Sequence, residues 1–253
     1  MGTDRIIIDA KIDSVKLNLN GAERILFRGI NFTLEKGSVF TLLGNNGVGK
    51  TTFLNTLLNL LDHRFYSIDG KINILGCDVL NSTEEELRSL RKKSIRFIFQ
   101  DAVNCFDPLR KILSYFNSIE YDSGYLDELL DYFLLPGKEI IFNYYPYQLS
   151  GGIAQRIAII WGIVSKPGLL IIDEPNSALD IPLSVLLSKK LVEISNESDL
   201  SILVVTQDLD FALNTECRIG LLKPDGILEY ANNVENIQLL KKELIREILV
   251  QAQ

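Results

Sequence analysis

The sequence predicts an α/β fold built on a parallel β-sheet. Residues 168–173 and 201–206 are almost wholly apolar, as expected for strands buried on both faces of such a sheet. Residues 183–195, which lie between them, show helical periodicity. A third apolar run, residues 38–43, ends in a glycine-rich segment and is followed by another helical pattern. Strand, helix and strand in alternation predict right-handed crossovers.

Length and composition are those of a folded protein. The chain has 253 residues, enough for one or two domains and a sizeable core. Its composition, 47% hydrophobic and 23% charged, excludes extended disorder. No apolar run approaches the roughly 18 residues needed to cross a bilayer, and no segment resembles an export signal. We therefore expect a cytoplasmic protein. The net charge of −7 disfavours nucleic acid as a partner.

Cysteine and histidine exclude several kinds of site. The three cysteines, Cys77, Cys105 and Cys217, are far apart and show no paired spacing, so we expect reduced thiols without a metal or redox role. The single histidine, His63, lies in a polar stretch typical of the surface. Catalysis that requires a histidine is therefore disfavoured.

Hydrophobic patterns predict the other elements in chain order. Strand-like patterns cover residues 12–19, 30–34, 72–76 and 94–100. Helical patterns cover residues 51–61, 84–93, 125–135, 152–164 and 236–253. The whole stretch 101–165 is helical in character. A strand-rich N-terminal part is thus followed by a helical segment and then by the two apolar strands.

The glycine-rich segment is a candidate phosphate-binding loop. It satisfies G-x-x-x-x-G-K-[ST] at every position, with an apolar strand before it and a helix after it. Glycines allow successive backbone N–H groups to face an anion, and the N-terminus of the following helix adds positive potential. Lys50 would hold the β- and γ-phosphates and Thr51 would ligate Mg²⁺. The candidate ATP-binding residues are Gly44, Asn45, Asn46, Gly47, Val48, Gly49, Lys50, Thr51 and Thr52.

Two acidic residues, Asp173 and Glu174, stand at the carboxyl end of the predicted strand over residues 168–173. In open α/β sheets, ligands bind at the carboxyl ends of the strands. We expect Asp173 to hold Mg²⁺ and Glu174 to orient and polarise an attacking water. A turn merely capped by carboxylates before Pro175 is the alternative.

A third segment decides which known family the sequence resembles. Residues 149–156 read Leu-Ser-Gly-Gly-Ile-Ala-Gln-Arg, and with the two phosphate motifs they resemble the signature of ATP-binding-cassette (ABC) ATPases. The resemblance extends over about residues 12–230. It implies that the signature contacts the γ-phosphate held by a partner subunit, so that two chains form two sites head to tail. A serine hydroxyl, glycine N–H groups and a helix N-terminus suit that task. The signature residues implied to contact nucleotide are Ser150, Gly151, Gly152 and Gln155.

The resemblance also implies a fold and further site residues. The fold is that of a P-loop NTPase, with a RecA-like parallel core, an N-terminal antiparallel β subdomain and a helical signature subdomain. One nucleotide-binding domain would span residues 1–253: a core over about 1–100 and 165–230, a helical subdomain over 101–164 and a C-terminal helix over 231–253. Gln100 matches the glutamine that links Mg²⁺ and water to the helical subdomain, and Asp180 ends the loop that crosses the dimer interface.

The sequence departs from the family pattern at two places. The family has a histidine after the strand over residues 201–206, and this chain has Gln207. Gln207 can donate a hydrogen bond but carries no charge. One lost donor of this kind costs on the order of 10²–10³ in rate. No aromatic residue precedes Phe27, so Leu19 or Ile25 would have to contact adenine.

The resemblance is greatest to the peptide and nickel importer branch. Residues 99–101, 107–108 and 145–150 carry it. It implies a peripheral ATPase on the inner face of the membrane, with permease subunits docked on residues 101–149 and a substrate-binding protein contacted indirectly. Tyr115, Phe116, Tyr121, Phe142 and Tyr144 are candidate docking aromatics. A soluble ABC ATPase of DNA maintenance or cofactor assembly is the alternative function.

Two hypotheses about the ATPase site remain open. Lys50, Gln100, Glu174 and Gln207 are the candidate catalytic residues, and Thr51, Gln100 and Asp173 the candidate Mg²⁺ ligands. The site could hydrolyse slowly while the intact signature completes a competent site on a different partner. Alternatively, the chain forms a homodimer in which Gln207 suffices.

Overall fold

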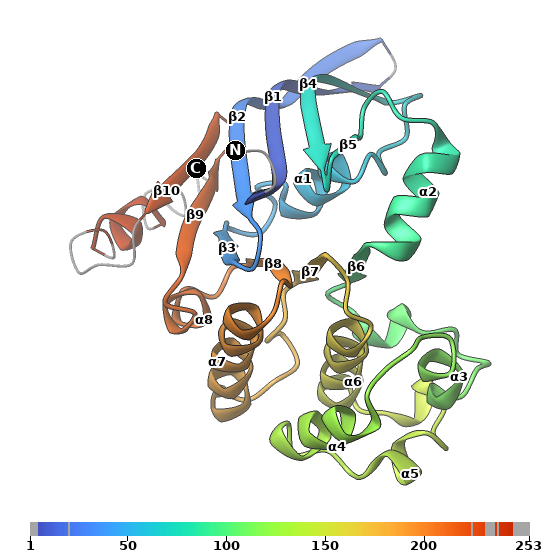
Figure 1. Cartoon of the computed structure of the whole chain (residues 1–253). Coiled ribbons are helices and arrows are strands. Elements are labelled where there is room, and N and C mark those ends of the chain that lie inside the picture. The colour runs from blue at the N-terminus through green and yellow to red at the C-terminus, as the bar shows by residue number, and fades with distance from the viewer. Residues whose placement is uncertain (1–4, 20, 224, 231–235, 237, 245–253) are drawn as a thin grey trace.

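A central six-stranded sheet organises the chain (Figure 1). The computed structural model describes residues 5–19, 21–223, 225–230, 236 and 238–244. The strand order is β10-β9-β3-β8-β7-β6, and only the β9–β10 pair is antiparallel. These strands are β3 (Val39–Leu43), β6 (Ile95–Ile98), β7 (Leu169–Asp173), β8 (Ser201–Thr206), β9 (Arg218–Lys223) and β10 (Gly226–Tyr230). The predicted α/β class with a parallel core is confirmed.

A second sheet is wholly antiparallel, in the order β2-β1-β4-β5. It contains β1 (Ile6–Leu19), β2 (Ala22–Glu35), β4 (Tyr66–Ile74) and β5 (Cys77–Asp78). Helix α1 (Lys50–Leu57) packs in the hydrophobic cluster that joins the two sheets. There the ring of Phe53 meets those of Phe27 and Phe32 edge to face. This packing fixes the start of α1, where the phosphate-binding loop ends.

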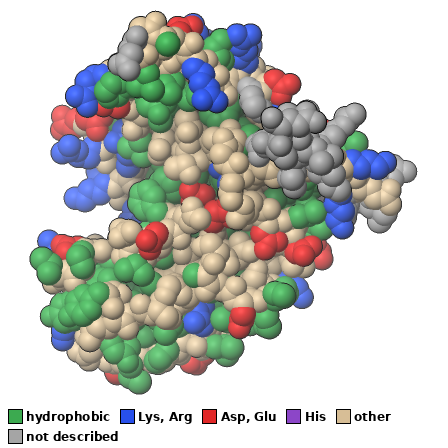
Figure 2. Space-filling model, turned by 180° about the vertical axis from the view of Figure 1, so that it is seen from behind, with side chains coloured by type: hydrophobic (Ala, Val, Ile, Leu, Met, Phe, Trp, Pro, Cys, Tyr) green, Lys and Arg blue, Asp and Glu red, His purple; other side chains and the backbone are tan. Residues whose placement is uncertain are grey.

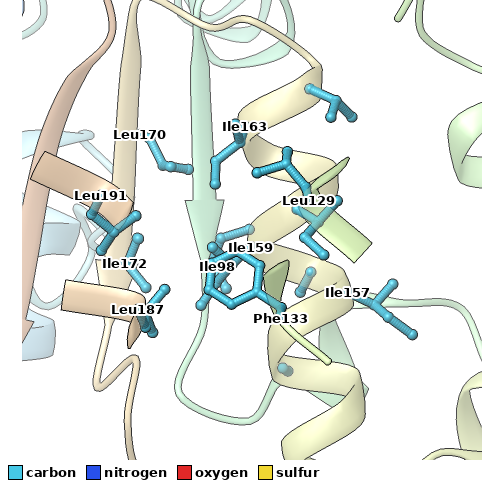
Figure 3. Close-up of a cluster of buried hydrophobic side chains, with 14 of the residues drawn as sticks. Ile98, Leu129, Phe133, Ile157, Ile159, Ile163, Leu170, Ile172, Leu187 and Leu191 are labelled. Atoms are coloured by element: carbon cyan, nitrogen blue, oxygen red, sulfur yellow. The ribbon is translucent and has the colours of Figure 1, made fainter. Parts of the chain in front are cut away.

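Helices cover the opposite face of the parallel sheet. Figure 3 shows Ile159 and Ile163 of α6 (Gly151–Val164) packed toward Ile98 of β6. Leu187 and Leu191 of α7 (Ile181–Glu197) lie beside Ile172 of β7 in the same cluster. Asp180 caps α7, and Pro182 occupies its first turn. Between β5 and β9 the other helices are α2 (Glu84–Lys93), α3 (Ile112–Phe116), α4 (Ser123–Tyr132), α5 (Lys138–Ile141), α8 (Leu209–Asn214) and the 3₁₀ turns Ala102–Cys105 and Pro146–Gln148.

Element boundaries differ from the sequence predictions where tertiary pairing dominates. β1 starts six residues before the predicted strand 12–19, because it pairs with β2 on one side and β4 on the other. The predicted helix 51–61 ends at Leu57. Asn59 has φ 50° and Leu60 N donates to Asn55 O, the geometry of a Schellman motif. The sequence patterns did not predict β9, β10 or α8. Of the predicted C-terminal helix, residues 236 and 238–244 are helical and the others lie outside the described residues.

Candidate active site

The phosphate-binding loop joins β3 to α1 in a conformation that only glycine permits. Gly49 is the N-cap residue of α1 with φ 106°, and a Cβ there would lie 2.6 Å from the ring of Phe27. No side chain caps this helix end. The first-turn N–H groups of α1 have no partners within their own helix, so they are free to bind an anion. The loop therefore fits a nucleotide phosphate chain.

Lys50 is buried at the centre of the site. Its Nζ donates to the carbonyl oxygens of Gly44 (2.9 Å) and Asn45 (3.3 Å) and lies 3.2 Å from Oε1 of Glu174. The predicted lysine and the predicted catalytic carboxylate are thus in direct contact. A charged lysine this deeply buried needs such partners, because desolvation penalises an unpaired ammonium.

Thr51 and Asp173 meet beside this pair. Thr51 Oγ1 donates to Asp173 Oδ2 at 3.3 Å. Burial, with a smaller contribution from the charge of Glu174, raises the pKa of Asp173. A hydroxyl and a carboxylate are the hard oxygen ligands that Mg²⁺ prefers, and a divalent cation would offset the buried negative charge. The two residues therefore fit the predicted metal site.

Glu174 follows β7 directly and has φ 49°, a left-handed backbone conformation. Its N–H donates to the carbonyl of Val205 in β8 at 2.8 Å. Its Oε2 accepts hydrogen bonds from Thr206 Oγ1 (2.9 Å) and Gln207 N (3.2 Å). Sequence reasoning missed Thr206. No motif signals it, because its partner is 32 residues away in the chain.

A pocket of about 290 Å³ opens over these groups. It brings together the loop, the acidic pair and Gln100, which follows β6. The lining residues are Asn46, Gly47, Gly49, Lys50, Thr51, Thr52, Gln100, Asp173 and Glu174. Leu19 and Ile25, predicted to contact adenine, pair within the β1–β2 hairpin and are not among them.

The signature turn lies outside this pocket. Ser150 is the N-cap of α6, and its hydroxyl accepts from Ile153 N at 3.4 Å. Gly152 packs on the predicted interface loop so closely that a Cβ would lie 2.6 Å from Ala178 O. Ser150, Gly151 and Asp180 are exposed. One chain therefore presents the signature on its surface and apart from its own phosphate-binding loop.

Two predicted site residues differ in accessibility. Gln207 is exposed, so its side chain can reach a ligand. Gln155 is only 1% exposed, and among the described residues neither of its amide atoms has a partner. The structure does not bring Gln155 to the surface that carries Ser150.

Among the described residues, no helix combines the length and apolar character that a membrane crossing requires. A family profile described as "ABC transporter" matches residues 27–177, more than half of the chain. The chain belongs to the ABC transporter family. It is therefore the ATP-binding, ATP-hydrolysing component of a transporter, as the signature and the two phosphate motifs predict.

Individual relatives agree with this assignment. The chain is 27% identical to the oligopeptide transport ATP-binding protein OppD of Lactococcus lactis, over 96% of this chain and 75% of that protein. It is 28% identical to the metal-staphylopine import ATP-binding protein CntD of Staphylococcus aureus, over 81% of this chain and 78% of that protein. The dimeric ATP-binding cassette MJ0796, solved with ADP and Pi, matches with a TM-score of 0.71 and 26% identity, over 89% of this chain and 99% of that chain.

Proposed function

We propose that this ABC ATPase powers the import of peptides or of small metal complexes. The observation that carries its role in hydrolysis is that Lys50, Thr51, Asp173 and Glu174 meet in one pocket. The import direction and the cargo class rest on relatives such as OppD and CntD, which are named for peptide transport and metal-staphylopine import.

The chain's own groups divide the work of binding. The N–H groups of the loop and the first turn of α1 hold the phosphates, with Lys50 as a point charge. Phosphate oxygens replace Glu174 as the partner of Lys50. Thr51, Asp173 and Gln100 are the residues that would hold Mg²⁺. The metal, when bound, neutralises charge on the phosphate oxygens.

Glu174 then accepts the proton of the attacking water. It can do so once Lys50 turns to the phosphates, because its Oε1 has no other hydrogen-bond donor among the described residues. Gln100 borders the same pocket at the end of β6 and adjoins the helical segment, so it can report nucleotide occupancy to that segment. Gln207 stands where the family has a histidine.

A second ATPase subunit completes the site. Ser150, Gly151, Gly152 and Asp180 lie away from the pocket of their own chain, and their surface would face the triphosphate held by a partner. We propose that the chain's own site is slow because Gln207 supplies no charge. The partner is then a different ATPase, whose competent site this signature completes.

The membrane partner docks on an exposed apolar patch of the helical segment. Figure 2 shows hydrophobic side chains gathered at the lower left of that view, on the lobe that carries the helices between β6 and β7. Of the predicted docking aromatics, Phe116 is buried and Tyr115, Tyr121 and Phe142 pack against the core, so only Tyr144 is exposed. The exposed apolar residues of this segment include Leu109 (84%), Leu113, Tyr144 and Tyr147 (66%).

This patch suits a cytoplasmic helix of a permease. Its apolar residues combine aromatic rings with leucines, and protein interfaces are enriched in aromatics. The chain then lies at the inner face of the membrane and contacts a substrate-binding protein only through the permease.

Co-purification from membranes tests the proposal. The tagged chain is expected to recover two polytopic membrane proteins and a second ATPase. The double substitution Leu109→Ser and Tyr147→Ser is expected to release the membrane proteins while MgATP binding is kept. Leu60→Ser, which alters an exposed leucine outside the helical segment, is the matched control. Recovery of soluble proteins alone would overturn the proposed docking of permease subunits.

A further inference from the structure

The carboxylate of Glu174 is held at both oxygens by different groups. Oε1 lies 3.2 Å from Lys50 Nζ, whereas Oε2 accepts from Thr206 Oγ1 and Gln207 N. We infer that Thr206 is a positioning residue, which anchors Oε2 so that Oε1 can exchange Lys50 for the attacking water while the carboxylate stays in place. This inference rests on the proposed role of Glu174 in hydrolysis.

The hydrogen bonds around Thr206 direct its hydroxyl proton toward Glu174. Asp208 N donates to Thr206 Oγ1 at 3.0 Å, so this oxygen acts there as an acceptor. Asn176 Nδ2 donates to Asp208 Oδ2 at 2.6 Å, and this bond turns the amide oxygen of Asn176, Oδ1, toward Thr206. That oxygen is 3.5 Å from Thr206 Oγ1, compared with 2.9 Å for the charged Oε2 of Glu174. The shorter, charge-assisted bond takes the single proton.

Burial makes this anchor hard to replace. Thr206 is 0% exposed and Glu174 is 4% exposed. The backbone of Glu174 is fixed by its hydrogen bond to Val205 O, but its side-chain torsions need another restraint. Without the hydroxyl, Gln207 N–H is the one donor to Oε2 that remains among the described residues. A poorly satisfied buried carboxylate is costly.

The anchored carboxylate suits the proton transfer that hydrolysis requires. The water oxygen forms a bond to the γ-phosphorus as its proton passes to Oε1 of Glu174. The bond between the γ-phosphorus and the bridging oxygen breaks, and its electron pair leaves on ADP. Because Oε2 is held by Thr206 and Gln207 N, Oε1 faces the water in a fixed direction, which favours a reactive geometry.

A double-mutant cycle on the purified full-length chain tests the anchor without relying on activity. Unfolding equilibrium constants are measured for wild type, Thr206→Val, Glu174→Ala and the double variant, all without nucleotide. We expect coupling of about tenfold, because Thr206→Val loses its main effect once the carboxylate is gone. Thr41→Val is the control, since Thr41 is also fully buried but bonds Thr215. Its coupling to Glu174→Ala should be absent.

Single-turnover hydrolysis with excess protein gives the second measurement. Thr206→Val is expected to slow hydrolysis by about tenfold or more with unchanged MgATP affinity, and Thr206→Ser to restore it. Absence of coupling in the cycle, or a Thr206→Val rate equal to that of Thr41→Val, overturns the anchor. If Glu174→Gln hydrolyses ATP as fast as wild type, the proposed role of Glu174 is wrong instead, and the two failures are thereby distinguished.

Discussion

Lys50 Nζ lies 3.2 Å from Glu174 Oε1, and the two side chains are only 8% and 5% exposed. The residue expected to hold phosphate and the residue expected to activate water therefore neutralise each other before nucleotide arrives. Such a buried pair is little screened by salt. We therefore expect nucleotide binding to replace this pair with contacts between Lys50 and phosphate oxygens, so that the same step frees Glu174 Oε1.

Replacing Lys50 should remove nucleotide binding. Lys50→Ala deletes the buried ammonium that contacts Gly44 O, Asn45 O and Glu174, and we expect no measurable MgATP binding by calorimetry. Lys36→Ala is the control, because Lys36 pairs with Asp199 at the surface and should leave affinity unchanged. Normal MgATP binding by Lys50→Ala would show that the site is wrongly assigned.

Replacing Glu174 by glutamine should separate binding from hydrolysis. Glu174→Gln keeps an oxygen that can accept from Thr206 and Gln207 N but loses the base. We expect hydrolysis to fall by roughly 10²–10⁴ while MgATP stays bound. Light scattering should then show an ATP-dependent dimer, formed by the chain alone or with its partner ATPase. Wild-type turnover by this variant would contradict the proposed mechanism.

The buried acid Asp173 should weaken the nucleotide-free protein at neutral pH. Burial raises the pKa of Asp173 above the model-peptide value of 3.8, so the folded state binds its proton more tightly than the unfolded state does. The resulting penalty is fully present above the folded pKa, shrinks as the pH falls through that pKa, and is gone below 3.8. Asp173→Asn is therefore expected to raise the melting temperature at pH 7 in metal-free buffer, with a smaller gain in acid.

Asp62 is a useful comparison, because its pKa is shifted in the opposite direction to that of Asp173. Hydrogen bonds from Arg64 lower the pKa of this exposed carboxyl to about 2. Its contribution to stability is present above the unfolded pKa and is lost as the pH falls toward 2, so Asp62→Asn should bring no gain at pH 7. A melting temperature for Asp173→Asn at or below wild type would contradict the prediction.

Restoring a histidine should accelerate a slow site. Gln207→His adds a side chain that can carry charge next to the end of β8, and we expect the hydrolysis rate of the purified chain to rise by roughly 10²–10³. Gln207→Ala is the comparison, and it should change little. Rapid hydrolysis by the wild-type chain alone that Gln207→Ala abolishes would favour the homodimer over a slow site with a distinct partner.

The phosphate-binding loop and the acidic pair could be predicted because their chemistry lies in contiguous residues. Gly49, Lys50 and Thr51 follow one another at a strand–helix junction, and the end of β7 supplies Asp173 and Glu174. The same local logic predicted the parallel strands, whose apolar runs reflect burial on both faces. Family resemblance then added the exposed Ser150 turn, which the structure places away from the pocket of its own chain.

Contacts between distant residues could not be predicted in this way. The bond from Thr206 to Glu174 depends on β8 lying beside β7, and a threonine at the end of an apolar strand gives no signal of it. Gln155 follows the signature glycines, but its place on the inner face of α6 removes it from the surface. Helix pattern alone likewise could not tell the buried Phe116 from the exposed Tyr147.

The absence of a side chain at Gly152 has a mechanical consequence. A Cβ at this position would lie 2.6 Å from Ala178 O, so any larger residue would push the start of α6 away from the predicted interface loop that ends at Asp180. Because the two backbones are this close, we expect the loop and the start of α6 to move together. A displacement of the loop would then reach the helical lobe through α6, which packs within that lobe.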